Sequence, residues 1–317
     1  MTVGPRLTMV EERWANRGRG QSKFANRKST TAVPEIGGYT LHEIETGRFG
    51  LDGGAMFGIV PKPLWEQELP ADERNRVPLA ARCLLLEGRD RLILIDNGVG
   101  AAPSEKFADI YALDREHSEL HRSLEAAGHE AGDVTDVILT HLHFDHCGGT
   151  TYCDDEGDWQ LTFEHADHHV QRKHWEWART SNPKEKGSFR SENLDPLADS
   201  GTIELVDGRE EILHDIEALP VHGHTEAQQM VKIGDGDDAL VFVADLLPTT
   251  RHLKPAWTMA YDVRPMRTIE EKADFLDEAE RAGWTLFFEH DPDTAVADLK
   301  RTDHGVELAN PRSLEQG

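Results

Sequence analysis

One short stretch near the middle of the chain constrains its fold more than any other feature. Residues 140–149 read Thr-His-Leu-His-Phe-Asp-His-Cys-Gly-Gly and directly follow the apolar run Val137-Ile138-Leu139. That run predicts a short buried strand, so the polar cluster falls on the loop at the strand's carboxyl end. Four potential metal ligands lie within six residues of this loop: His141, His143, Asp145 and His146. Imidazole and carboxylate groups at this density suit zinc or a similar first-row metal.

The spacing of these ligands makes the pattern specific. A single histidine on a loop is usually a solvated side chain, and the chain contains 17 histidines. Alternation lets an extended loop point His141, His143 and Asp145 to one side, while His146 can reach a second ion nearby. With the Gly-Gly that follows, the pattern resembles the signature of the metallo-β-lactamase-fold hydrolases. We expect Cys147, inside the motif, to be a small buried neighbour rather than a ligand.

Three later residues follow predicted strands in the same way. His224 lies in Val221-His222-Gly223-His224-Thr225, Asp245 follows residues 240–244, and His290 follows residues 286–289. The family resemblance implies one ion held by His141, His143 and His224, and a second held by Asp145, His146 and His290. It implies that Asp245 bridges the two ions. His224 is preferred to His222 because Gly-His-Thr is the family's form here, although Ala227-Gln228 replaces a second Gly-His that the family often carries.

The expected chemistry is hydrolysis. Two close cations, expected to be Zn²⁺, lower the pKa of a shared water from about 16 towards about 7, so that a metal-bridging hydroxide can attack, and they polarise the substrate carbonyl. Asp145 is the expected carrier of a proton to the leaving alkoxide. Redox di-iron relatives have a glutamate at the position of His143, so this histidine favours hydrolysis over electron transfer.

Residues 51–65 narrow the resemblance. They include Gly-Gly-Ala-Met-Phe-Gly-x-Val-Pro-Lys-x-x-Trp, which resembles the branch containing quorum-quenching N-acyl-homoserine lactonases. Three glycines and two prolines predict a structured loop with exposed apolar side chains rather than a helix or strand. The resemblance implies that this loop shapes the acyl pocket and a homodimer contact, with four candidate pocket residues: Met56, Phe57, Ile59 and Trp65. The alternative is a loop that only covers the core.

The lactone-binding residues are less well specified. Several homoserine lactonases have a tyrosine three residues after the bridging aspartate, and this chain has Pro248 there. Tyr261 could substitute for it as a catalytic group, and His252 is a second candidate for the pocket wall. The leading prediction is therefore a dinuclear zinc lactonase acting on N-acyl-homoserine lactones. The alternatives are the same site acting on a phosphotriester, thioester or aryl ester, and a non-catalytic metal-binding protein.

Composition limits the partners and the compartment. The chain has 317 residues, 38% of them hydrophobic, and a formal charge of −25. Residues 1–34 carry a net charge of +5 and predict a disordered tail, and the remaining residues carry −30. Such a strongly negative charge on residues 35–317 argues against nucleic-acid partners. It is typical of a halophilic protein, and it can equally serve solubility alone. No apolar run is long enough to span a membrane, no secretory signal is evident, and three cysteines fit a reducing cytoplasm.

The remaining pattern predicts one hydrolase domain over residues 35–317. Strands are expected at 39–49, 79–86, 91–96, 159–163, 202–206, 216–221, 230–233 and 239–244, with a last one at 284–288. Helices are expected at 113–127, 167–179 and from a capping box at Thr268 to Gly283, and residues 181–200 are expected to be a surface excursion. Two groups of strands, each followed by helices, predict an α/β (α+β) fold: a four-layer αβ/βα sandwich of two mixed sheets flanked by helices.

Overall fold

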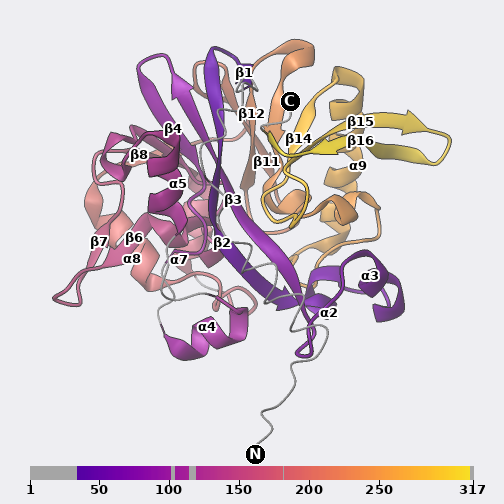
Figure 1. The fold of residues 1–317 in the computed structure, drawn as a ribbon, viewed down its shortest axis with the longest axis horizontal. Helices are drawn as coiled ribbons and strands as arrows, with labels where there is room; N and C mark the ends of the chain where they lie inside the picture. The colour runs from indigo at the N-terminus through magenta and orange to yellow at the C-terminus, as the bar shows by residue number, and fades with distance from the viewer. Residues whose placement is uncertain (1–33, 101–103, 114–118, 181, 315–317) are drawn as a thin grey trace, which may run out of the picture.

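The computed structural model describes residues 34–100, 104–113, 119–180 and 182–314. Within these ranges the strands form two seven-stranded sheets and one small hairpin (Figure 1). The first sheet has the order β1 (Glu35–Ile36), β2 (Tyr39–Asp52), β3 (Arg76–Gly88), β4 (Arg91–Ile95), β5 (Asp136–Ile138), β8 (Asp167–Gln171) and β9 (Ile203–Val206). The hairpin pairs β6 (Thr151–Cys153) with β7 (Trp159–Leu161).

The second sheet is built from the C-terminal half. Its order is β10 (Glu211–Leu213), β11 (Ile216–Val221), β12 (Gln228–Ile233), β13 (Leu240–Phe242), β14 (Thr285–Phe287), β15 (Val296–Thr302) and β16 (Gly305–Arg312). Both sheets are mixed. Strands β4, β5, β8 and β9 run parallel, as do β13 and β14, and the other pairings are antiparallel.

The two sheets pack face to face and helices cover their outer faces, so the predicted four-layer sandwich is confirmed. Alternation along β3 explains the layering, because successive side chains of a strand point to opposite faces. Leu84 and Leu86 pack between the sheets with Val231 and Phe242. Leu85, on the opposite face, packs beneath the helices of the first sheet. Each such fully buried side chain stabilises the fold by about 1.5–3 kcal/mol.

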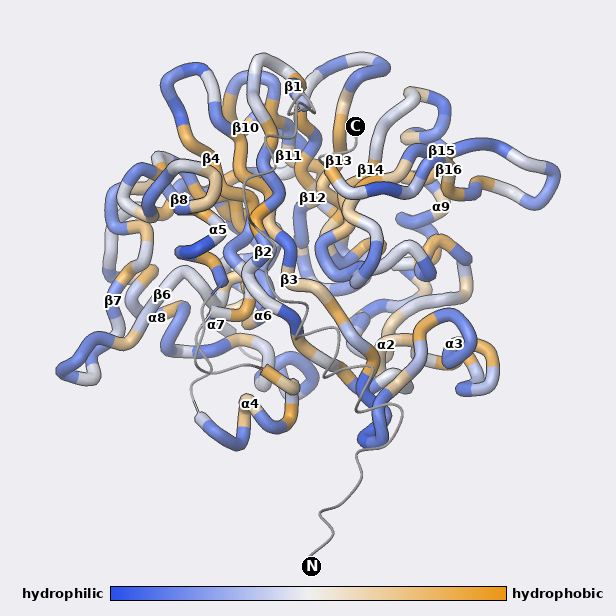
Figure 2. Tube along the Cα trace, in the orientation of Figure 1, coloured by the Kyte–Doolittle hydropathy of each residue, from blue (hydrophilic) through white to orange (hydrophobic). Residues whose placement is uncertain are grey.

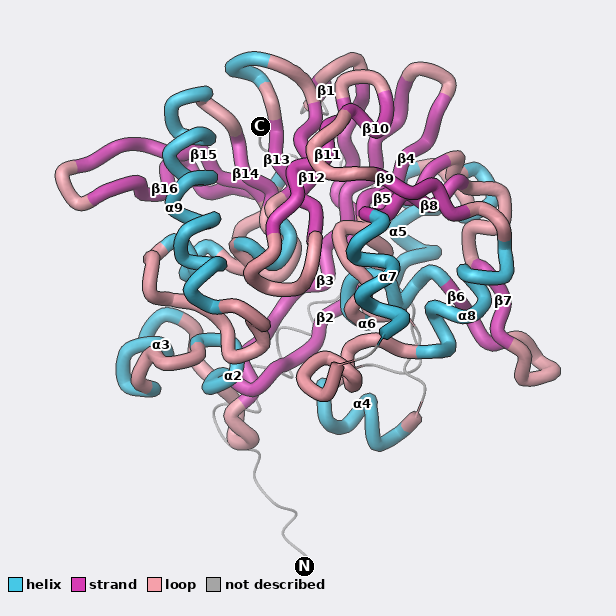
Figure 3. The backbone as a smooth tube through the Cα atoms, turned by 180° about the vertical axis from the view of Figure 1, so that it is seen from behind, coloured by secondary structure: helices cyan, strands magenta, loops and turns pink. Residues whose placement is uncertain are grey.

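The helices divide between the two outer layers. α5 (Glu119–Ala127), α7 (Arg172–Thr180) and α8 (Ser191–Ser200) cover the first sheet, and α9 (Pro265–Ala282) covers the second (Figures 1 and 3). α2 (Gly53–Phe57), α3 (Lys62–Glu68) and α4 (Glu105–Tyr111) lie towards one end of the sandwich (Figure 1). Hydropathy follows the same plan, with apolar strands inside and polar loops outside (Figure 2).

The segment 51–65, predicted to be a structured loop without helix or strand, instead contains the helix α2 and the first part of α3. Asp52 caps α2 by accepting a hydrogen bond from the Ala55 backbone N–H at 2.8 Å, and Pro63 stands in the first turn of α3, where a missing N–H costs little. The prediction of exposed apolar side chains is also wrong for Met56, Phe57 and Trp65, which are buried; Ile59 alone of the four is exposed, at 86%.

Other predicted elements need correction. Residues 167–171 form strand β8 rather than the first turns of a helix, because they pair with β5 and β9. The helix predicted from 113 begins at Glu119 within the described residues, and α9 begins at Pro265 rather than at a capping box. The strand at 285–287 is followed by β15 and β16, so it is not the last. Residues 181–200 contain helix α8 and are not simply a surface excursion.

Two further predictions concern the N-terminal tail and membrane-spanning helices. The basic tail predicted at residues 1–34 lies outside the described residues except for Pro34. Among the described helices, none is both long and apolar enough to cross a bilayer.

Candidate metal centre

Seven side chains predicted from the sequence meet at one edge of the two sheets. His141 and His143 follow β5, and α6 (Phe144–Cys147) then carries Asp145 and His146. The other three follow strands of the second sheet: His224 after β11, Asp245 after β13 and His290 after β14. All seven side chains are buried, so the fold withdraws them from solvent together.

The seven residues form two triads joined by one carboxylate. In the first triad, His143 Nδ1 lies 3.2 Å from His224 Nε2, and His141 is within the same cluster. In the second, His146 Nε2 lies 3.1 Å from His290 Nε2, and Asp145 is the third member. Asp245 Oδ2 lies 3.3 Å from His224 Nε2 and 3.6 Å from His146 Nε2, while its Oδ1 lies 3.3 Å from His290 Nε2.

The donor set fits two divalent cations. His141 Nε2 and Asp245 Oδ1 are buried and make no hydrogen bond to any described residue. Such atoms are costly to bury without a partner, and cations bound at the two triads would satisfy both. The closely facing ring nitrogens of the two histidine pairs have the same explanation, because imidazole lone pairs directed at one point favour a shared ion. His141, His143 and His224 would hold one ion, and Asp145, His146 and His290 the other.

Each histidine uses its second nitrogen to bind a protein group. His143 Nε2 donates to Glu185 at 3.2 Å, and His224 Nδ1 donates to Asp262 at 3.0 Å. His290 Nδ1 donates to the Ala80 carbonyl at 2.8 Å. Thr140 Oγ1 donates to Asp96 and therefore accepts from His141 Nδ1. These bonds set the tautomer of each ring and direct its free lone pair into the centre.

His146 lies beside two carboxylates, of which only Asp96 shares a hydrogen bond with it. Its Nδ1 lies 3.0 Å from Asp96 Oδ2 and 2.9 Å from Glu289 Oε2. Asp96 also accepts hydrogen bonds from the backbone and side chain of Thr140, whereas neither oxygen of Glu289 has a hydrogen-bond partner within the described structure. Burial raises the pKa of Glu289 well above its ordinary value, against the pull of His146. Burial therefore favours the neutral form of Glu289.

The protonation of the centre suits metal binding. Burial lowers the pKa of His141, His143 and His290, which keeps these rings neutral. Although burial acts in the opposite sense, His146 and His224 among its neighbours lower the pKa of Asp245 and keep it ionised. Nearby carboxylates raise the pKa of His146 and His224, so binding of cations there would release protons.

The sequence of residues 76–290, more than half of the chain, matches the metallo-β-lactamase superfamily. The chain belongs to this superfamily. This confirms the family predicted from the His-x-His-x-Asp-His motif, and it identifies the protein as a metallo-β-lactamase-type hydrolase with a centre suited to divalent metals.

Solved structures and curated relatives agree with this membership. A probable metal-dependent hydrolase from Staphylococcus aureus is 31% identical, with a TM-score of 0.79 over 88% of this chain and 98% of that one. AidC, a dizinc quorum-quenching lactonase solved with its product, is 22% identical, with a TM-score of 0.71 over 88% and 96% of the two chains, and shows the shared fold. An N-acyl homoserine lactonase of Bacillus cereus is 25% identical over 53% of this chain and 64% of its own length. The chain thus spans less than two thirds of the curated relatives it matches.

The two residues predicted for the lactone site, His252 and Tyr261, have different surroundings in this hydrolase. His252 is buried, and its ring nitrogens already contact Thr249 Oγ1 at 2.8 Å and the Met56 carbonyl at 2.9 Å. Burial lowers its pKa to about 4, and its ring stacks on Phe57. Tyr261 is half-buried beside the centre. Burial raises the pKa of its phenol, and Tyr111 and the Asp145 carboxylate raise it further.

Sequence reasoning missed a second phenol at the same place. Tyr111, on α4, packs against Phe144 with ring centroids 4.8 Å apart, and Phe144 directly precedes Asp145. Burial raises the pKa of Tyr111, and the Asp145 carboxylate raises it further. Within the described residues, neither Tyr111 nor Tyr261 forms a hydrogen bond through its hydroxyl. The amphipathic pattern of residues 105–111 could have predicted α4, but nothing local indicates what it covers.

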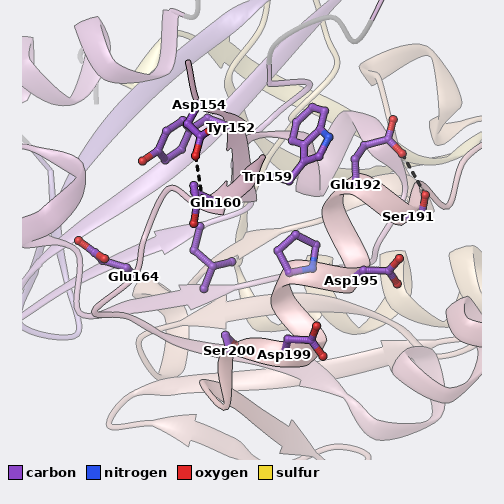
Figure 4. A pocket seen from close by; sticks show the side chains of 12 residues that line it. Tyr152, Asp154, Trp159, Gln160, Glu164, Ser191, Glu192, Asp195, Asp199 and Ser200 are labelled. Carbon is purple, nitrogen blue, oxygen red and sulfur yellow. Dashed lines mark hydrogen bonds between the residues drawn. The ribbon is translucent and has the colours of Figure 1, made fainter. Parts of the chain in front are cut away.

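One hollow on the described surface lies away from the centre. It has a volume of about 1020 Å³ and lies between the β6–β7 hairpin and α8 (Figure 4). Tyr152 and Trp159 contribute rings, and five carboxylates surround them: Asp154, Glu164, Glu192, Asp195 and Asp199. Because the seven predicted metal-binding residues are not part of its lining, this hollow is separate from the candidate site.

Proposed function

We propose that this protein is a dinuclear zinc hydrolase that opens the ring of N-acyl-homoserine lactones. The observation that carries the proposal is the position of Asp245, whose carboxylate reaches ring nitrogens of both histidine triads within 3.3–3.6 Å. A centre of this kind serves carbonyl hydrolysis. The likeness to the AidC and Bacillus cereus lactonases supports a lactone as the substrate.

The two cations, when bound, would supply a hydroxide nucleophile at neutral pH and stabilise negative charge on the carbonyl oxygen. The protein's own groups have separate tasks. Asp145 would carry a proton to the leaving alkoxide. Tyr261 and Tyr111 would donate hydrogen bonds to the lactone, in place of the tyrosine that is absent at Pro248. Both phenols remain protonated at neutral pH, because their pKa values are raised.

The acyl chain would lie along apolar side chains at the entrance. Phe107, Tyr111 and Phe144 form a contiguous aromatic cluster, and the exposed Ile59 lies on the turn after α2. Of the four predicted pocket residues, Ile59 is therefore the one we propose for direct contact. Met56, Phe57 and Trp65 would act from beneath by supporting α2. Ile59 and the exposed Leu64 also make this segment our proposed homodimer contact.

A second candidate substrate class deserves a test because of Pro248. Without a tyrosine at this position, the same dimetal site could prefer another ester: a phosphotriester, a thioester or an aryl ester. We also propose that the protein resides in the cytoplasm and that it acts on small molecules, without nucleic-acid or membrane partners. The three cysteines are unpaired, and Cys83 and Cys147 are buried.

The test is metal analysis followed by a substrate panel on the full chain. We expect about two zinc ions per chain, and kcat/KM values for N-acyl-homoserine lactones that exceed those for paraoxon, p-nitrophenyl acetate and an acyl thioester. A His222→Ala variant is the control for His224→Ala, because His222 lies outside both triads. If lactones stay intact while phosphotriesters or aryl esters are hydrolysed rapidly, the second substrate class replaces the lactones in the proposal. One ion or none, with no gain on adding zinc, would end it.

A further inference from the structure

Two buried side chains, from α7 and from the loop before α8, contact the first triad from behind. They are His174, on α7, and Glu185, in the loop that follows. We propose that His174 and Glu185 form a clamp that orients the first metal site selectively, while the second site is held independently. This inference rests on the dinuclear metal assignment of the proposed function, but not on its lactone substrate.

Glu185 orients His143. Its side chain is 3% exposed, and its Oε1 accepts a hydrogen bond from His143 Nε2 at 3.2 Å. Its Oε2 accepts from Trp177 Nε1 at 2.8 Å and from Asn182 Nδ2 at 2.5 Å, so the carboxylate cannot rotate freely. Because Nε2 carries the proton, the lone pair of His143 must lie on Nδ1, the atom that faces His224. The carboxylate also makes that lone pair more basic.

His174 ties together the two loops that carry the first triad. Its Nε2 accepts a hydrogen bond from the Leu142 backbone N–H at 2.8 Å, and Leu142 lies between His141 and His143. Its Nδ1 donates to the Glu226 carbonyl at 2.7 Å, two residues after His224. A neutral imidazole can make both bonds at once, and the ring is fully buried. One side chain thus sets the separation of ligands that are about 80 residues apart in sequence.

Phe189 completes the clamp by packing on both rings. Its ring centroid lies 4.9 Å from that of His143 and 5.8 Å from that of His174. The loop between α7 and α8 is therefore anchored on the imidazole that it orients. A purely peripheral loop would not place a buried carboxylate and a buried aromatic ring on the same histidine.

The second triad is held by other parts of the fold. His146 binds Asp96, which follows β4, and lies beside Glu289. His290 binds the Ala80 carbonyl of β3. Loosening the clamp should therefore lower metal affinity at the first site and leave the second site occupied. A general loss of stability would instead affect both sites.

The experiment measures metal binding on the full chain by chelator competition with Zn²⁺, together with the absorption spectrum of the Co²⁺-loaded protein. Glu185→Gln keeps the size of the side chain and removes its charge. We expect it to weaken one of the two ions by roughly 10–100-fold, the effect typical of such outer partners, and to leave the other within about twofold. Glu164→Gln, an exposed glutamate, is the matched control.

His174 provides a second, graded comparison. Gln can still accept from the Leu142 N–H, whereas Leu cannot, so His174→Gln should retain more first-site affinity than His174→Leu. To assign the weakened ion, Glu185→Gln is added to His290→Ala and to His224→Ala. Glu185→Gln should lower metal affinity in the His290→Ala background, where the first site remains. It should have little effect in the His224→Ala background.

The outcomes separate the two proposals. Equal weakening of both ions, or no change in either, overturns the clamp. A wild-type chain that binds fewer than two ions overturns the clamp and the metal assignment together. A wild-type chain that binds two ions but leaves lactones intact refutes the proposed substrate, and the clamp is then judged on the affinities alone.

Discussion

Asp245 is the residue on which the two halves of the centre depend. Its two oxygens face His224, His146 and His290, so its removal would leave three ring nitrogens without their shared anion. We expect Asp245→Ala to lose metal and activity together, with kcat/KM falling by a factor on the order of 10³ or more. Elemental analysis and lactone hydrolysis measure the two effects, and Asp235→Ala, at an exposed turn, is the control. Retention of two ions with near-normal turnover would show that this residue does not bridge them.

The phenols of Tyr111 and Tyr261 allow a separation of metal binding from substrate binding. Tyr→Phe removes only the hydroxyl and, at Tyr111, preserves the ring packing against Phe144. We expect Tyr261→Phe and Tyr111→Phe each to lower kcat/KM for lactones by about 10- to 100-fold, since each loses one hydrogen-bond donor near the reacting carbonyl. Metal content should not change. Tyr152→Phe, in the distant hollow, provides the matched control, and wild-type rates in both variants would exclude the phenols from the reaction.

Single residues differ in how far they can be predicted. His141, His143 and His146 share one short motif, and His224, Asp245 and His290 each follow a strand. Local pattern and family resemblance were therefore sufficient to predict that these residues form one site. Their partners carry no such mark. Glu185 is 42 residues from His143, and Asp262 is 38 residues from His224, in segments of ordinary polar composition. Only the packing of α7 and of the loop before α9 brings these carboxylates to the rings.

At the scale of elements, α2 packs in the core and against the loop that carries Tyr261. The Ala260 N–H donates to the Ala55 carbonyl at 2.8 Å, next to Tyr261. Gly58 permits this close contact between the end of α2 and the loop at Thr258. Its φ of +56° is left-handed, and a Cβ there would lie 2.6 Å from the Thr258 carbonyl oxygen. Within α2, Phe57 stacks between Trp65 and His252. The exposed side of the segment can therefore be changed independently of its buried side.

This division gives a prediction for the segment. Phe57→Ala or Trp65→Ala should destabilise the protein by about 3–5 kcal/mol, because each leaves a cavity in the core. Ile59→Ser should leave stability within about 0.5 kcal/mol and flatten the rise of kcat/KM with acyl-chain length, where each buried methylene contributes about 0.8 kcal/mol. Denaturant unfolding and a series of acyl chain lengths measure the two effects. An unchanged chain-length trend in Ile59→Ser would remove this residue from the acyl site.

Helices and strands were predictable where the local sequence had a clear apolar run or a clear alternation of apolar and polar residues. β3 and β11 were found from their apolar runs. Residues 167–171 contain two histidines and no clear alternation, and only pairing with β5 and β9 makes them a strand. The predicted capping box at Thr268 failed for a related reason, because Glu271 accepts hydrogen bonds from the His222 and Gly223 backbone instead. In each case a contact with a distant segment outweighed the local preference.

The whole molecule carries a large negative charge, and much of it faces solvent. The net charge is −25, and the hollow between the β6–β7 hairpin and α8 alone gathers five carboxylates (Figure 4). Like charges held together in the folded state repel one another, and the unfolded chain relieves part of that repulsion by spreading them apart. Salt reduces the repulsion, because the Debye length falls from about 10 Å at 0.1 M to about 3 Å at 1 M.

We therefore expect the stability of this protein to increase with salt. Between about 0.1 and 1 M NaCl, Tm should rise by a few degrees, since a gain of about 1 kcal/mol shifts Tm by roughly 1–2 °C in a chain of this size. The matched comparison is Glu164→Gln/Asp195→Asn/Asp199→Asn, which removes three exposed charges around the hollow. This variant should have a higher Tm at low salt and a smaller dependence on NaCl, because less repulsion remains to be screened. Scanning calorimetry at constant zinc concentration separates this effect from metal binding. A Tm that is constant or falls with NaCl would mean that surface repulsion does not limit stability, and the acidic composition would then serve solubility alone.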